Sequence, residues 1–188
     1  MIKSIINICR MKKLITILLS LLTLVSYSQT ELDMLVFESL NEYRIENGVE
    51  PLVFDSIVWE AAQHHSVYLS ENGYTTEYVC SSGHLELELV NFSDRLNHFD
   101  VKWTGTGGEC IATWSGKRTN EESVTQVIHQ WDGSPSHKKG LLKTDVTRMA
   151  ISIVTAPVNC DVSFIYKGKE YGNKFTGVIY FATFLVVE

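Results

Sequence analysis

Apolar residues recur at helical spacing in the first part of the chain. One run begins at Thr30, which Asp33 follows three residues later as in a capping box, and it continues to Gly48. A second run begins after Asp55, which can cap a helix, and stops at Gly73. We predict two amphipathic helices in these stretches.

Two further stretches are helical candidates. Asn120 is expected to cap a helix whose apolar face runs to Trp131, with acidic residues in its first turn. The stretch from Leu85 to Phe99 is a weaker candidate because its first leucines also alternate as in a strand.

The last quarter of the chain has the pattern of strands. Residues Arg148 to Val154 alternate, Asp161 to Tyr166 precede a turn at Lys167 to Lys169, and Gly177 to Val187 are rich in β-branched and aromatic residues. Helices followed by strands predict a layered α+β domain.

The N-terminus resembles a secretory signal. A basic segment at Met11 to Lys13 precedes an apolar stretch from Leu14 to Val25, and small residues follow at Ser26 and Ser28. We predict that residues 1–28 are a signal peptide cut after Ser28, with Met11 as an alternative start. The other interpretation, a membrane anchor, is disfavoured because spanning hydrocarbon takes about 20 apolar residues.

Removal of the signal leaves a single domain at residues 29–188 that is secreted or periplasmic and has no transmembrane anchor. The segment removed carries four basic residues and no acid, so the formal charge changes from −6 to −10. An acidic surface argues against nucleic acid and anionic lipid as partners.

Three cysteines follow the predicted signal, namely Cys80, Cys110 and Cys160. This odd number allows at most one intrachain disulfide. If His84 and Glu109 meet in the fold, Cys80 and Cys110 form the first pair to test. Three buried, reduced cysteines are the equal alternative.

Candidate chemistry lies at three places where elements end or loops begin. His84 follows a Gly-containing loop, Glu109 follows two glycines, and His137 follows a Ser-Pro turn at the end of the Asn120 helix. His64 and His65 are adjacent on a helix, so they point about 100° apart and cannot chelate together; His65 is expected to be packed and hydrogen-bonded.

An ordered set of segments resembles the CAP superfamily, named for cysteine-rich secretory proteins, antigen 5 and plant pathogenesis-related class 1 proteins. The closest similarity is to its bacterial secreted branch, whose unit is also called the SCP domain, and it covers roughly residues 32 to 186. The segments are Leu40 to Arg44, Asn47 to Val49, Pro51-Leu52, Trp59 to Ala62, His84, Gly108-Glu109 and Trp131 to Leu142. The resemblance implies a three-layer α-β-α sandwich with a large central cleft.

The resemblance also implies a cleft that carries two histidines and two acidic residues. His84, Glu109 and His137 fall on three of these positions. The fourth is Ser134 here, as is common in bacterial relatives, and Cys110 replaces the usual asparagine.

Three roles for this cleft stay open. His84 and His137 could bind a divalent metal such as zinc, with Glu109 as third ligand or as orienting group. Ser134 or Ser136 could act as a nucleophile beside an oriented imidazole, although Ser134 is more simply a turn residue. Alternatively, the three side chains hydrogen-bond one another and hold loops around a groove.

Non-enzymatic recognition of an extracellular or envelope ligand is the favoured function, with or without a metal. The alternatives are a metal-assisted hydrolase acting on peptides or cell-wall material, and a carrier of apolar ligands or sterols.

Overall fold

The computed structural model describes residues 29–72, 83–166 and 169–188. The elements, in chain order, are α2 (Glu31–Glu46), β1 (Val53–Phe54), α3 (Ser56–Asn72), α5 (Phe92–His98), β2 (Gly107–Ser115), α6 (Asn120–Asp132), α7 (Pro135–Leu141), β3 (Arg148–Tyr166) and β4 (Lys169–Val187).

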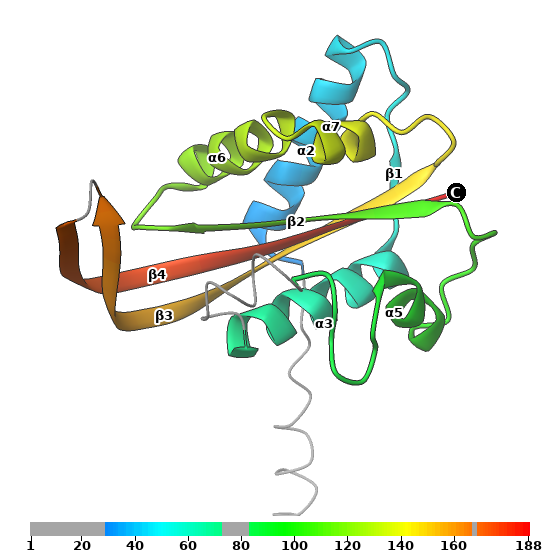
Figure 1. Cartoon of the computed structure of the whole chain (residues 1–188). Coiled ribbons are helices and arrows are strands. Elements are labelled where there is room, and N and C mark those ends of the chain that lie inside the picture. Colours follow the sequence, from blue (N-terminus) through cyan, green and yellow to red (C-terminus); the bar gives the residue numbers. More distant parts are fainter. Residues whose placement is uncertain (1–28, 73–82, 167–168) are drawn as a thin grey trace, which may run out of the picture.

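One four-stranded sheet in the order β1-β3-β4-β2 forms the middle layer. β1 pairs with β3 in parallel, and the other two pairings are antiparallel. Helices α2, α6 and α7 cover one face of the sheet, and α3 and α5 cover the other (Figure 1). The predicted α+β fold, a three-layer α-β-α sandwich, is therefore confirmed.

Each face of the sheet has its own apolar layer. On the α2 and α6 side, Trp131 packs against Phe184 with ring centroids 5.7 Å apart, and neither is more than 1% exposed. On the α3 and α5 side, Trp59 and Leu96 pack with Leu185. Because both faces are buried, residues of one strand alternate between two interiors.

The first two helices begin where the sequence indicates. Thr30 Oγ1 accepts a hydrogen bond from the Asp33 amide at 3.1 Å, and Asp33 Oδ2 accepts one from the Thr30 amide at 3.0 Å, which completes the capping box. Gly48 follows the end of α2 at φ +74°, a conformation that favours glycine. Asp55 Oδ1 accepts from the amides of Ile57 and Val58 at the start of α3.

Three local predictions are wrong. Within residues 85–99 only Phe92–His98 is helical, because Asn91 caps α5 and the preceding residues form an irregular loop. The cap of α6 is Thr119, whose hydroxyl accepts from the Glu122 amide, while Asn120 is its first helical residue. The Ser-Pro segment is not a turn that places His137 in a loop. Pro135 begins the short helix α7, so His137 lies on a helix.

The strands are longer than their sequence pattern indicates. β3 and β4 pair along their whole length, from Arg148 opposite Val187 to Tyr166 opposite Lys169. The predicted signal peptide at residues 1–28, Cys80 and part of the predicted turn at residues 167–169 lie outside the described residues. Across the described ranges, no helix is both long and apolar enough to span a bilayer.

Candidate functional site

Two adjacent side chains of strand β2 point into different apolar layers, one on each face of the sheet. Glu109 and Cys110 are adjacent, so they point to opposite faces of the sheet. Cys110 is 3% exposed and packs in the layer that contains Trp131. Glu109 faces α5 on the other side, where it reaches Arg95.

The Glu109 carboxylate is held at both oxygens. Its Oε1 lies 2.8 Å from His84 Nδ1, and its Oε2 accepts from Arg95 Nη2. The Glu109 side chain is 2% exposed, whereas that of His84 is 50% exposed. Since Nδ1 of His84 donates to Glu109, Nε2 of the neutral imidazole carries the lone pair.

A second carboxylate, Glu86, lies on the other side of Arg95. Glu86 Oε1 is 3.3 Å from Arg95 Nη1 and 2.7 Å from His65 Nδ1, and its side chain is 1% exposed. Its Oε2 is 3.2 Å from His64 Nδ1, although that nitrogen does not have hydrogen-bond geometry. One guanidinium thus connects two buried carboxylates.

His65 ends this chain of charges. Its Nε2 lies 2.8 Å from the carbonyl oxygen of Gly83, and its Nδ1 faces Glu86. Both partners are hydrogen-bond acceptors. His65, Glu86, Arg95 and Glu109 thus follow one another as alternating basic and acidic side chains, and the Gly83 bond fixes the backbone beside His84. The prediction that His65 is packed and hydrogen-bonded is confirmed.

This network determines the ionisation of Glu109. Burial opposes the charged form, but the hydrogen bond from His84 and the positive charges of His65 and Arg95 outweigh it. The pKa of Glu109 is therefore held below its usual value, and the carboxylate is ionised at neutral pH.

His137 is the third residue of α7. Its Nδ1 is buried and has no hydrogen-bond partner among the described residues. Burial, followed by the positive charge of His84, lowers the pKa of His137, so its imidazole is neutral at neutral pH. The helix is anchored at its C-terminus by Arg44, whose guanidinium donates to the carbonyl oxygens of Leu141 at 2.5 Å and Lys143 at 3.0 Å.

The two serines contact each other. Ser134 Oγ and Ser136 Oγ are 3.1 Å apart, and Ser134 makes no side-chain cap to α7. In the described part of the chain neither hydroxyl is hydrogen-bonded to an imidazole, so this geometry gives no support to a serine nucleophile.

A hollow of about 650 Å³ lies between the start of β2 and α7. Its lining includes Glu109, Cys110 and Ser136, together with Lys139 and Lys143. His84 and His137 are not among its described lining residues.

Cys110 is buried and forms no disulfide with another described residue. Its Sγ lies 3.7 Å from the His137 carbonyl oxygen. Burial, with the Glu109 charge adding to it, raises the pKa of Cys110 to about 12, so the thiol is protonated and a poor nucleophile. Because Cys80 lies outside the described residues, the pairing of Cys80 with Cys110 stays a prediction.

The donor set does not fit a three-ligand zinc centre. Both Glu109 oxygens are engaged by His84 and Arg95, so the carboxylate orients an imidazole rather than offering a free ligand atom. Among the described residues, no group of three or more His, Cys, Asp or Glu side chains is arranged to hold a metal ion.

Sequence reasoning missed Glu86 and Arg95. Both lie between Leu85 and Phe99, where the pattern predicts one helix and charged residues are expected on its solvated face. The available signal was the position of Glu86 among Leu85, Leu87 and Leu89, because an acid inside an apolar run suggests a buried partner.

Comparison with known proteins identifies the class to which this sandwich belongs. The sequence matches the Cysteine-rich secretory protein family, CAP, over residues 37–166. The chain belongs to this family.

Three bacterial solved structures share the fold. An extracellular protein from Bacillus anthracis that contains an SCP domain is similar with a TM-score of 0.58 and 19% identity, covering 84% of this chain and 40% of that one. An outer surface protein from Borrelia burgdorferi has a TM-score of 0.53 and 19% identity, over 86% of this chain and 97% of that one. A cysteine-rich secretory protein from Staphylococcus aureus has a TM-score of 0.51 and 15% identity, over 87% and 40% of the two chains.

A curated relative, an uncharacterized membrane protein of Bacillus subtilis, is 26% identical over 125 residues. The match covers 66% of this chain and 32% of that protein, so this chain spans about a third of its length.

Proposed function

We propose that this protein is an exported CAP domain that recognises a ligand at the surface around His84 and His137, where the buried Glu109 orients His84, without transforming the ligand. The observation that carries the proposal is the arrangement at Glu109. The carboxylate is buried and held at both oxygens, while the imidazole that it orients is half exposed. Such a carboxylate is poorly placed as a general base, but it fixes His84 with Nε2 available to a ligand donor.

The loop that follows His84 supports recognition by adding apolar contacts. Leu87 is 86% exposed and Val90 is 50% exposed. Glu86, which precedes them in the loop, is buried in the charge network. Exposed apolar side chains beside an oriented polar group are typical of binding surfaces. The loop is closed by a bond from the Glu86 amide to the Val90 carbonyl oxygen at 3.2 Å.

Export is part of the proposal. It is supported by the signal-like N-terminus and by the extracellular and outer-surface relatives.

The test is binding of the full mature chain to arrays of bacterial envelope glycans and of peptides that contain no lysine or arginine. We expect His84→Ala with His137→Ala, and separately Leu87→Ser, to abolish or weaken binding of every ligand that the wild type retains. A matched control replaces the exposed His98 and His129 by alanine and should bind as the wild type does. Equal binding by the site variants and the wild type would refute the proposed surface.

The same array distinguishes the second candidate, a metal-assisted hydrolase. Its specific support is that a carboxylate orienting a histidine is a common outer-shell arrangement at zinc sites, so His84 and His137 alone would be the protein ligands and Glu109 would stay outside the ligand set. Mass spectrometry of the array ligands after incubation with zinc would then show cleavage products that the double histidine variant does not form. Binding that survives a chelator, without products, supports recognition.

A further inference from the structure

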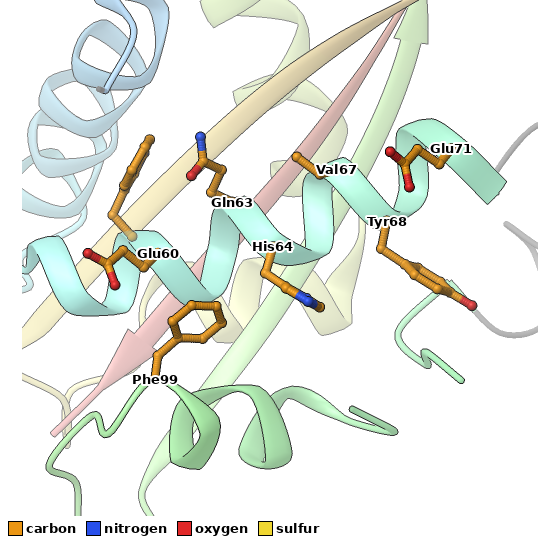
Figure 2. A pocket seen from close by; sticks show the side chains of 8 residues that line it. Glu60, Gln63, His64, Val67, Tyr68, Glu71 and Phe99 are labelled. Carbon is orange, nitrogen blue, oxygen red and sulfur yellow. The ribbon is translucent and has the colours of Figure 1, made fainter. Parts of the chain in front are cut away.

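A groove of about 500 Å³ runs along the outward face of α3. Figure 2 shows that His64, Tyr68 and the Phe99 ring lie on the same side of this helix. The lining contains none of His84, Glu109 and His137. The groove is therefore a second concave surface. It adjoins the charge network of the first site at His64, which lies beside Glu86. Its size is within the range of ligand pockets.

The floor of the groove is aromatic and its rim is acidic. Trp59, Tyr68 and Phe99 contribute rings, and the Phe99 ring meets His64 edge-on with centroids 5.7 Å apart. The two acidic residues of the rim, Glu60 and Glu71, are both exposed. Among its described lining residues the groove has no lysine or arginine. This combination attracts a cation with an apolar body, since aromatic faces and carboxylates both stabilise positive charge.

The spacing of the two carboxylates narrows the class of ligand. Glu60 and Glu71 are eleven residues apart on one helix, which is three turns, so they share a face and their backbones are about 16 Å apart. An extended peptide advances about 3.3 Å per residue. Side chains of an extended peptide alternate between its two sides, so two basic residues that face the helix together lie an even number of positions apart. Four positions separate their backbones by about 13 Å, and the length of the basic side chains covers the remaining distance.

We infer that the α3 groove binds an extended peptide segment that carries two basic residues four positions apart, with apolar side chains between them. The two cations pair with Glu60 and Glu71, and the intervening residues cover Val67 and the Phe99 ring. Arginine suits this site better than lysine, because its planar guanidinium stacks on aromatic faces and pairs with carboxylates.

The experiment measures fluorescence anisotropy of a blocked, dye-labelled peptide with two arginines four positions apart and leucines between them. We expect saturable binding that Glu60→Gln with Glu71→Gln weakens about fivefold, as for two exposed ion pairs, and that rising salt also weakens. The matched control, Glu38→Gln with Glu50→Gln, removes the same charge from other exposed positions and should leave the affinity unchanged. The wild type should bind peptides with the arginines two positions apart about as weakly as the Glu60→Gln, Glu71→Gln variant binds the first peptide.

Three results would overturn the inference. These are no saturable binding by the wild type, equal binding by the groove variant and the wild type, and affinity that ignores arginine spacing. Spermine competing as strongly as the peptide would also overturn it, because the groove would then select charge alone. The double His84 and His137 variant should keep full binding, so failure at the first site and failure at this groove are distinguishable.

Discussion

Replacing Arg95 by methionine removes the only guanidinium between two buried carboxylates. The side chains of Glu86 and Glu109 are 1% and 2% exposed, and each would keep one imidazole partner after the change. Removing one partner of a buried ion pair costs about 3–5 kcal/mol. Because the remaining imidazoles compensate in part, we expect a loss of about 3 kcal/mol in the free energy of unfolding at pH 7.

The loss should depend on pH with a defined sign. In the wild type the pKa of Glu109 is held below its usual value, so its ionisation stabilises the fold above that value, and this stabilisation is lost as pH falls through the folded pKa. Without Arg95, the desolvation of Glu109 is less opposed and protonation relieves a buried charge. The difference between variant and wild type should therefore shrink as pH falls from about 7 to about 5.

Urea denaturation followed by circular dichroism measures both effects. Adding Glu109→Gln to the Arg95→Met variant should restore part of the stability, since one unpaired charge is removed. Lys138→Met serves as the control because it breaks an exposed ion pair with Asp132, and we expect no measurable change. A loss below about 1 kcal/mol at pH 7, or a difference that grows on acidification, would refute the reasoning.

Three other changes test the site. His84→Gln should raise the pKa of His137, measured by NMR titration of its ring protons, because a like charge is removed; an unchanged or lower pKa would contradict their proximity. Gly140→Ala should destabilise the fold by about 1–3 kcal/mol in urea titrations, because its Cβ would lie 2.9 Å from Cys110 Sγ; if the added Cys110→Ala does not restore stability, the clash is not the cause. Cys110 should resist alkylation at pH 8 in the native protein and react after denaturation without reductant, as followed by peptide mapping; rapid native labelling would show that the thiol is accessible.

The arrangement of elements could be predicted from the sequence because most of its signals are local. The capping box at Thr30 and Asp33 and the apolar faces of α2, α3 and α6 specify these helices without reference to the rest of the chain. The prediction of one helix from Leu85 to Phe99 was wrong because the structure of this stretch depends on contacts with residues distant in the sequence. Glu86 is drawn inward by His65 and Arg95, and this tertiary contact overrides the local helical pattern.

The candidate site could be predicted only in part. A resemblance in ordered motifs identified His84 and Glu109, whose side chains do meet at 2.8 Å. It could not indicate that Arg95 occupies the second oxygen of Glu109, because burial of a charge depends on partners that are distant in the fold. It is this contact that makes Glu109 an orienting group.

Because Glu86 and Glu109 share the guanidinium of Arg95, substitutions at these three positions depend on one another. A lineage that loses Arg95 first carries two poorly compensated carboxylates, and one that loses either acid first leaves a buried cation with half its partners. Single replacements of Glu86, Arg95 or Glu109 are therefore more costly to stability than the replacement of all three together, which favours retention of the loop geometry beside His84.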